Sequence, residues 1–480
     1  MKTWKLLGSG ILVTCMWSLY VAPLWAQEGA EEKPKPAGRV LMPLPDLSGD
    51  QQDSDQGNET MQPDLGPATG VQAATLGTSQ LRHSYWATGV QYGNTAQSSS
   101  FGSTQGAGGW TTTSFATGNL SILEAWSHST VGVNYSGGES FSSASGQGNG
   151  QFHQLSSSWQ IYQRRWQALV MEQFSYLPQS SFGFGGTSGL ATPGISGALG
   201  APLTGFQNSF LPGQGILSVG GPRYSSTSAV QMTYDVSRRG GITVAVVHGL
   251  LRFSNSGNIN SDTETLNVGY NYAITRKDSL GVSYRFNALH FQGSPQAVGD
   301  QLFQLMYSRR ITGRLALNLG GGPDITNFRV ATNGTKQSIS GGGSASLTYA
   351  FAKSSLRASY THGISSGSGL FTGSRSDQVT ATWSLPLSRA WDSSWTSGYS
   401  RNTTIVAVQG LPSPTYNSVL AGAGINRSLG RSARFSIGYQ AAIQTFGGVV
   451  CTPAASCQPT QVTHQTQLSL QWNAPPQVLR

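Results

Sequence analysis

The stretch "SLGVSYRFNALHF", residues 279–291, alternates between apolar and polar side chains almost without error. The apolar positions are Leu280, Val282, Tyr284, Phe286 and Ala288. The polar positions between them are Ser279, Gly281, Ser283, Arg285 and Asn287. A period of two indicates an extended strand, because successive side chains of a strand point to opposite faces. The strand belongs to a sheet with one apolar face and one face that carries arginine, asparagine and serine.

The same alternation recurs from about residue 81 to the end of the chain. The clearest apolar series are Val230/Met232/Tyr234/Val236, Leu266/Val268/Tyr270/Tyr272/Ile274, Leu315/Leu317/Leu319, Ala345/Leu347/Tyr349/Phe351, Leu356/Ala358/Tyr360, Val379/Ala381/Trp383/Leu385, Ala433/Phe435/Ile437/Tyr439 and Leu468/Leu470/Trp472. Ser, Thr, Gly, Asn, Gln and an occasional Arg separate the apolar positions. The chain is therefore predicted to be all-β.

Connections between the predicted strands are alternately short and long. Short polar turns are expected at 127–129, 163–165, 237–241, 275–278, 311–313, 352–354, 388–392 and 430–432. Longer loops rich in Gly, Ser, Asn and Pro are expected near 94–110, 137–150, 177–225, 254–260, 291–299, 323–336, 365–375, 405–415 and 447–460. Such an order predicts an up-and-down antiparallel meander of about 18 strands, and 16 lies within the usual boundary error.

The composition favours a barrel in a membrane over a water-soluble sheet. Charged residues make up only 10% of the chain, whereas a soluble domain carries about 25%. A soluble sandwich would need charged surfaces and edges, and a propeller or solenoid would repeat at a fixed period. No run of about 20 apolar residues follows the N-terminus, which excludes helical spans. A closed barrel pairs every backbone group, as hydrocarbon requires, with its apolar face toward lipid and its polar face toward the lumen.

Aromatic residues near the predicted strand ends are typical of the girdles at the two membrane interfaces. They are Trp126, Tyr135, Trp166, Tyr176, Trp383, Trp395, Tyr439 and Trp472. With these features, residues 81–473 resemble the porin-like outer-membrane β-barrels of Gram-negative bacteria. The final strand "THQTQLSLQW" (463–472) has Leu470 and Trp472 in the manner of that family, although the C-terminal extension 474–480 departs from its pattern. The resemblance implies a transmembrane barrel in the cell outer membrane.

The N-terminal region has a different composition. Residues 1–26 are typical of a secretory signal peptide, with Lys2 and Lys5 before an apolar stretch and Ala26 at a plausible cleavage point. Residues 27–80 are rich in Pro, Gly and acidic groups, which predicts a disordered periplasmic tether. Within it, "RVLMPLPDL" (39–47) is either a linker with a few hydrophobic residues or a docking peptide for a periplasmic partner. In an exported protein, Cys451 and Cys457 are expected to form a disulfide rather than a metal site.

Polar-face residues of the predicted strands are candidates for the pore lining. They are Arg285, Arg314, Arg357, Arg434, Asp235, Asn287, Asn267 and Asn271. Arginines that line a pore favour anions, so a weak anion preference is expected. The alternative is that each arginine is neutralised by a lumen acid such as Asp235. The longest loop, 177–225, has no charge before Arg223 and either narrows the pore or remains outside.

Other patterns point to no further chemistry. Glu124 and Glu172 fall among apolar partners, which indicates either a bulge or the water interface. "GISSG" (363–367), beside His362, matches GxSxG, but that motif needs a strand–turn–helix elbow, and here it leaves a strand into a polar loop. The seven histidines are scattered, and the basic residues are spread over turns. No enzyme activity, cofactor, metal site or nucleic-acid partner is therefore predicted.

Two functions from different classes follow. The first is passive diffusion of small polar or anionic solutes through an outer-membrane channel. The alternative is a structural, assembly or adhesin-type barrel in outer-membrane lipid, whose tether binds a periplasmic partner.

Overall fold

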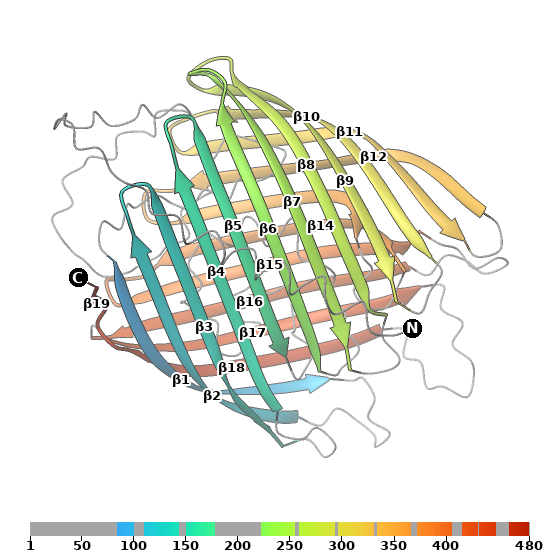
Figure 1. The fold of residues 1–480 in the computed structure, drawn as a ribbon. Coiled ribbons are helices and arrows are strands. Elements are labelled where there is room, and N and C mark those ends of the chain that lie inside the picture. Colours follow the sequence, from blue (N-terminus) through green and yellow to red (C-terminus); the bar gives the residue numbers. More distant parts are fainter. Residues whose placement is uncertain are drawn as a thin grey trace, which may run out of the picture. The chain divides into compact units, whose positions relative to one another are not determined.

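A computed structural model gives the fold of the chain (Figure 1). It describes residues 84–99, 110–143, 150–177, 222–254, 259–292, 296–330, 334–365, 372–405, 415–430, 432–447 and 460–479. These residues form strands and turns only. None of them belongs to a helix long and apolar enough to cross a membrane.

Eighteen strands form the wall, and a nineteenth is very short. They are β1 (Tyr85–Ser99), β2 (Trp110–Ala125), β3 (Ser129–Ser142), β4 (Gly150–Tyr162), β5 (Trp166–Leu177), β6 (Arg223–Asp235), β7 (Gly240–Phe253), β8 (Ser261–Ala273), β9 (Asp278–Phe291), β10 (Ala297–Arg310), β11 (Leu315–Val330), β12 (Gly334–Ala350), β13 (Ser355–Ser365), β14 (Ser374–Pro386), β15 (Trp391–Thr404), β16 (Thr415–Leu429), β17 (Ala433–Gly447), β18 (Thr460–Asn473) and β19 (Gln477–Val478).

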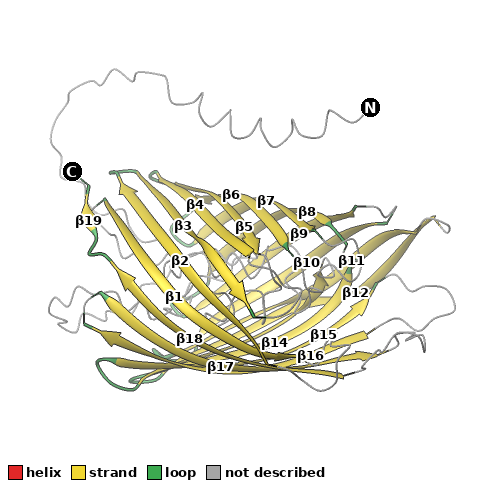
Figure 2. Ribbon diagram, turned by 90° about the horizontal axis from the view of Figure 1, so that it is seen from below, coloured by secondary structure: helices red, strands yellow, loops and turns green. Residues whose placement is uncertain are grey.

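The strands close into a ring. Each strand from β1 to β18 pairs antiparallel with the next, and β1 pairs with β18 from Gly89↔Asn473 to Ser99↔Thr463 (Figures 1 and 2). The short β19 pairs with the first two residues of β1. Ring closure leaves no open sheet edge along this seam, as a lipid-exposed sheet requires. The prediction of an up-and-down barrel of about 18 strands is confirmed.

Side-chain exposure distinguishes the outer face of the barrel from the inner face. On β8, Leu266 and Tyr270 are 37% and 39% exposed. The residues that directly follow them, Asn267 and Asn271, are only 2% and 3% exposed. On β9, Leu280 and Val282 are exposed and Ser279 and Ser283 are buried. The apolar face is therefore the outer surface, and the polar face looks into the barrel. A closed antiparallel barrel with an apolar outer face and a polar inner face is the architecture that the alternation predicts.

The outer surface also carries the expected aromatic residues. Trp126, Trp166, Trp383, Trp395 and Trp472 are all exposed. Trp166 packs against Tyr234 on the neighbouring strand, with ring centroids 4.5 Å apart. These rings lie at or near the short turns, where an interfacial girdle is expected.

The short turns lie where the sequence predicts them, but several strands are longer than expected. Most clearly, the expected loop 323–336 is largely strand, because β11 runs to Val330 and β12 starts at Gly334. The difference arises from Pro323, Asp324 and Asn327, residue types with a weak strand propensity, which make this segment resemble a loop. The ladder is nevertheless continuous, and next to this segment the triplet Gly320–Gly322 of β11 pairs with Ser344, Gly343 and Gly342 of β12.

Close backbone approach explains part of this glycine cluster. A Cβ atom at Gly322 would overlap the carbonyl oxygen of Phe303 on β10, and one at Gly343 would lie 2.9 Å from the carbonyl oxygen of Gly320. No other residue type fits such a contact without a backbone shift.

The two out-of-phase glutamates have different explanations, and neither is a bulge. Glu124 lies at the turn-side end of β2 and is exposed, paired with Val131. Glu172 is mid-strand on β5, in an unbroken register with β4 and β6. Ser226 donates to Glu172 Oε1 at 2.8 Å, and Ser228 donates to Oε2. The pair Ser228–Glu172 is on the face of exposed Val230, so Glu172 is on the outer surface.

Some predictions concern residues outside the described ranges. They are the signal peptide 1–26, the tether 27–80 with its segment 39–47, most of the loop 177–225, and the cysteines Cys451 and Cys457.

Candidate functional site in the barrel lumen

The inner face is closely packed along much of the wall. On β6, β7 and β8, inward residues such as Thr227, Gln231, Thr243 and Thr265 are buried. Inward apolar residues are buried as well, among them Phe115, Met171, Leu302 and Leu420. Side chains that lined a wide open channel would be exposed to water. Along these strands, the inward side chains are therefore shielded from water.

A more accessible strip of the inner face runs over β12 to β15. It is rich in hydroxyl groups: Ser346, Ser359, Thr361, Thr380, Thr382 and Thr396 are half-buried or exposed. Ser346, Ser359 and Thr380 are register partners on neighbouring strands, and the hydroxyls of Ser359 and Thr380 are 2.6 Å apart. Their strand neighbours Tyr360, Val379 and Trp383 are exposed on the outer surface.

Arg357 is the cation at the centre of these hydroxyl groups. It lies on β13 between its register partners Thr348 and Thr382. Thr348 is buried on the inner face, and directly opposed residues share a face of the sheet. Among the described residues, no carboxylate lies within ion-pair distance of Arg357. Hydrogen-bonding hydroxyls and one cation therefore offer contacts to a polar solute.

Arg285 is held in a polar cluster on β9 and β10. Its guanidinium is 3.9 Å from Asp300 Oδ2 on β10. Asn287, two residues further along β9, donates from Nδ2 to the same oxygen at 3.1 Å. Arg285 and Asn287, both predicted to face the lumen, thus lie beside the same carboxylate, Asp300. Asp300 is not among the residues that the sequence predicts for the lumen.

Arg434 is also neutralised. Its Nη2 is 2.8 Å from Asp392 Oδ2 on β15, and Asn426 on β16 donates to the same oxygen at 2.8 Å. The alternative of arginines paired with lumen acids therefore fits Arg285 and Arg434. The acids are Asp300 and Asp392, whereas Asp235 lies at the turn-side end of β6, opposite Gly241.

Arg314 is displaced from its expected place on a strand. It lies in the turn before β11 and is exposed, because β11 begins only at Leu315. The hydroxyl of Thr312 accepts from the backbone N–H groups of Arg314 and Leu315, at 3.2 and 3.1 Å, which fixes the turn. Arg314 thus belongs to the turn-side rim.

The acids Asp300 and Asp324 were missed because their strands lack a clean alternation. The inner face of β10 carries Val298, Leu302 and Met306, all buried, together with Asp300. Apolar residues therefore occur on both faces of "AVGDQLFQLMYSRR", and the pattern does not identify the inner one. On β11, the residues Gly320–Gly322 have no side chains, so the alternation does not show which face of the sheet Asp324 occupies.

An apolar cluster lies at the loop-side end of the lumen. Leu289 and Phe291 of β9 and Val298 of β10 form its buried part, with Ile259, Phe328, Ile364 and Ile405 packed against it. A Cβ atom at Gly373, which precedes β14, would lie 3.3 Å from Val298 Cγ2. Thr372 also donates to Gln296 Oε1. Residues before β14 therefore contact the ends of β9 and β10, although β11, β12 and β13 lie between them in the ring.

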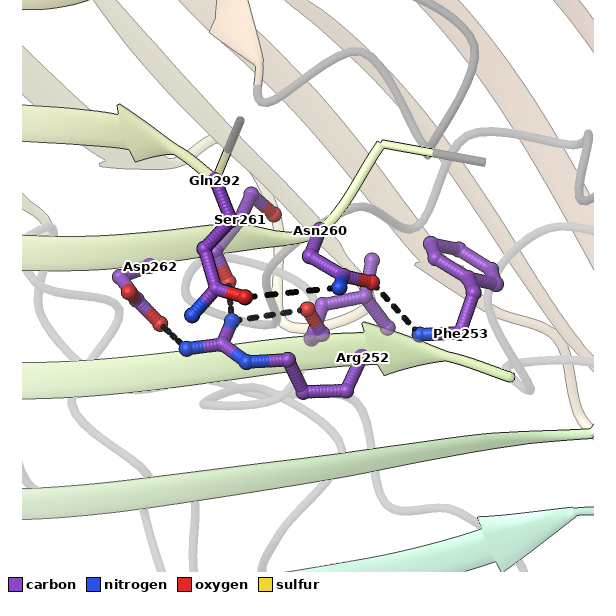
Figure 3. A network of polar contacts seen from close by, with 7 residues as sticks. Arg252, Phe253, Asn260, Ser261, Asp262 and Gln292 are labelled. Carbon is purple, nitrogen blue, oxygen red and sulfur yellow. Dashed lines mark hydrogen bonds and ion pairs between the residues drawn. The ribbon is translucent and has the colours of Figure 1, made fainter. Parts of the chain in front are cut away.

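Polar contacts fix the loop-side ends of β7, β8 and β9. Arg252 Nη1 donates to the carbonyl oxygens of Leu251 and Ser261, each at 3.0 Å, and Nη2 pairs with Asp262 (Figure 3). The backbone N–H of Phe253 donates to Asn260 Oδ1 at 2.8 Å (Figure 3). This network connects the ends of adjacent hairpins and stabilises the rim beside the apolar cluster.

The GxSxG match does not form an elbow in its described part. Gly363, Ile364 and Ser365 lie in strand β13. His362 Nδ1 is 2.6 Å from Asp377 Oδ1, and the Tyr360 hydroxyl donates to the same oxygen at 2.9 Å. Within the described ranges, no group of three His, Cys, Asp or Glu side chains could hold a metal ion.

Comparisons with known proteins find a likeness in structure alone. No family model and no curated protein matches the chain. Among solved structures, Pseudomonas aeruginosa OccK2 (OpdF) is similar with a TM-score of 0.44 and 9% identity, over 81% of this chain and 98% of that one. Pseudomonas aeruginosa OpdQ has a TM-score of 0.41 and 10% identity, over 82% and 98%. The Acinetobacter baumannii ferric preacinetobactin receptor BauA has a TM-score of 0.42 and 9% identity, over 81% and 80%.

Proposed function

We propose that the protein is a passive outer-membrane channel for small polar solutes. The observation that carries this proposal is the accessible, hydroxyl-rich strip on the inner face of β12 to β15, inside a closed barrel whose outer face is apolar. Ser and Thr hydroxyls donate and accept hydrogen bonds, so they can replace the water that a polar solute loses on entry. Movement along such a surface needs no energy source beyond the solute gradient.

A weak anion preference is part of the proposal. Arg357 supports it, because this lumen arginine has no carboxylate partner among the described residues, whereas Arg285 and Arg434 are near Asp300 and Asp392. A single uncompensated cation attracts anions without excluding neutral solutes. The remaining predicted lining residues, Asn267 and Asn271, are buried polar groups of the wall rather than accessible contacts.

Single-channel recording in planar bilayers tests the channel. Refolded full-length protein should give discrete conductance steps, and a KCl gradient should give a reversal potential on the anion-selective side. Swelling of liposomes in small sugars and in carboxylates would then rank the solutes. Protein that is folded but carries no current in repeated insertions would contradict the proposal.

A structural or adhesin-type barrel is the second candidate. The buried inner faces of β6 to β8 favour it, because a filled barrel serves as an anchor as well as an open one. In this case, residues 39–47 would bind a periplasmic partner and the N-terminal segment would lie in the periplasm. Absence of current, together with loss of a crosslinked periplasmic partner on deletion of 39–47, would favour this candidate over the channel.

A further inference from the structure

The strongest unassigned feature is a pair of carboxyl groups inside the barrel wall. Asp300 of β10 is 0% exposed and Asp324 of β11 is 1% exposed. Asp300 pairs with Thr326 of β11, two residues from Asp324, so both carboxyl groups lie on the inner face at neighbouring positions of the ladder. Adjacent carboxylates repel one another and are costly to bury, so something must hold them together.

The described side chains satisfy only one of the four carboxyl oxygens. Asp300 Oδ2 accepts from Asn287 Nδ2 and is 3.9 Å from the Arg285 guanidinium. Asp300 Oδ1 and both oxygens of Asp324 have no hydrogen-bond partner. The guanidinium and the amide thus approach one oxygen of Asp300, and its other oxygen has no partner among the described residues.

Two hydroxyl groups on the same face provide an independent sign of a ligand. Thr326, the register partner of Asp300, is 0% exposed, and its Oγ1 has no hydrogen-bond partner. The Oγ of Ser340, the register partner of Asp324, is also unpaired. Directly opposed residues share a face of the sheet, so these hydroxyls and carboxylates line one place on the inner wall.

The charge balance indicates which ligand fits. With both carboxyl groups ionised, the two carboxylates and the one guanidinium leave one net negative charge in a buried site. Apart from Arg285 Nε, the unpaired atoms there are oxygens, the donors that Ca²⁺ prefers, and Ca²⁺ completes its shell with water. We propose that Asp300, Asp324 and Thr326, with Ser340, form a Ca²⁺ site in the lumen wall.

Binding would have two effects. The ion would cross-link β10 and β11 beside the glycines Gly320–Gly322, where the wall has no side chains to pack. It would also change the net charge of the cluster from negative to positive, next to Arg285. The first effect does not depend on transport, whereas the second rests on the proposed channel function.

Thermal unfolding of the detergent-refolded full-length protein tests the site without any channel measurement. After treatment with EDTA, the melting temperature is measured in CaCl2, in MgCl2 and in NaCl of equal ionic strength. We expect Ca²⁺ to raise the melting temperature more than the other salts. Asp324→Asn should abolish that difference, and Asp392→Asn, which alters the other paired lumen acid, should preserve it.

Thr326→Val provides a second variant with no change in charge, in case Asp324→Asn does not refold. It should weaken the Ca²⁺-dependent rise while the melting temperature in EDTA changes little. A wild-type melting temperature that follows pH but not Ca²⁺ would show a carboxyl pair that shares a proton, and would overturn the proposal. An equal response of Asp324→Asn and wild type would overturn it as well.

A reversal-potential measurement separates this proposal from the channel. If the protein conducts, Ca²⁺ should move the reversal potential of wild type toward anions more than that of Asp324→Asn. If it does not conduct but Ca²⁺ still raises the melting temperature, the site is supported and the channel is not.

Discussion

Arg357, Arg285 and Arg434 all face the barrel interior, but their surroundings differ. Arg434 is bonded to Asp392, and Arg285 is near Asp300. Arg357 is surrounded by threonine hydroxyls on the neighbouring strands. A paired arginine contributes little net field, because its acid cancels the charge seen by a solute.

Replacement of Arg357 by glutamine should therefore reduce the anion preference. We expect the reversal potential in a KCl gradient to move toward the cation-selective side while the conductance changes little. Arg314→Gln, which removes an exposed charge of the turn-side rim, is the matched control and should leave the reversal potential near that of wild type. Equal shifts in both variants would mean that selectivity arises from overall charge.

Glu172 is a carboxylate on the lipid-facing surface, with Ser226 and Ser228 as its hydrogen-bond donors. Charged groups on that face are destabilising near the bilayer midplane. Glu172→Leu should therefore raise the free energy of unfolding by about 1 kcal/mol, measured by urea unfolding in lipid vesicles. Glu124→Leu, at the turn-side end of β2, should have a smaller effect. A large loss of stability in Glu172→Leu would show that the carboxylate is a structural contact.

The sequence predicts which face of the sheet a residue occupies where its strand alternates cleanly between apolar and polar residues. Asn267, Asn271, Arg285 and Asn287 have the predicted phase, because their strands separate apolar from polar residues. The prediction failed for Asp300 and Asp324, whose inward neighbours are Leu302 and glycine. The partner of a side chain on the neighbouring strand depends on the register between the two strands. Alternation within one strand does not reveal this register.

At the scale of elements, β11 and β12 show how pairing overrides local preference. The predicted loop 323–336 was too long, because Pro323, Asp324 and Asn327 have a weak strand propensity but pair within the ladder of β11 and β12. Gly320–Gly322 and Gly341–Gly343, on either side of this segment, also lie within strands. Turns with basic and polar residues, such as 163–165 and 430–432, were placed correctly because their signals are local.

Gly322→Ala should disrupt the β10–β11 ladder, since its Cβ would overlap the Phe303 carbonyl oxygen. We expect the unfolding free energy to fall by about 3 kcal/mol, or the protein not to refold. Gly341→Ala is the control, because a Cβ atom there has open space around it. Heat modifiability on electrophoresis reports the folded fraction of each. Equal folding of the two variants would contradict the close backbone approach.

At the scale of the whole molecule, the barrel has a polar interior that becomes apolar toward its loop-side end. Leu289, Phe291 and Val298 form this part with residues from β13, β15 and the segment before β14. Ring closure and the orientation of the two faces follow from composition and alternation. The apolar cluster does not, because it joins residues from strands that are distant in sequence.

Phe291→Ala should widen the loop-side end of the lumen and raise the single-channel conductance, at a cost in unfolding free energy of about 3 kcal/mol. Phe303→Ala removes an exposed ring from the outer surface and is the matched control for loss of an aromatic side chain. Its conductance should equal that of wild type. Unchanged conductance in Phe291→Ala would show that the cluster does not limit passage.

The seam between β1 and β18 brings the two ends of the described chain together. The backbone N–H of Ala474 donates to the carbonyl oxygen of Thr88 at 2.7 Å, and that of Leu479 to Ser84 at 2.8 Å. Because the ring is closed, the fold does not require β1 to be the first strand in the chain. A circular permutant that links Leu479 to Ser84 and starts at Gly240 should rebuild the same ring, with a different strand completing it during membrane insertion.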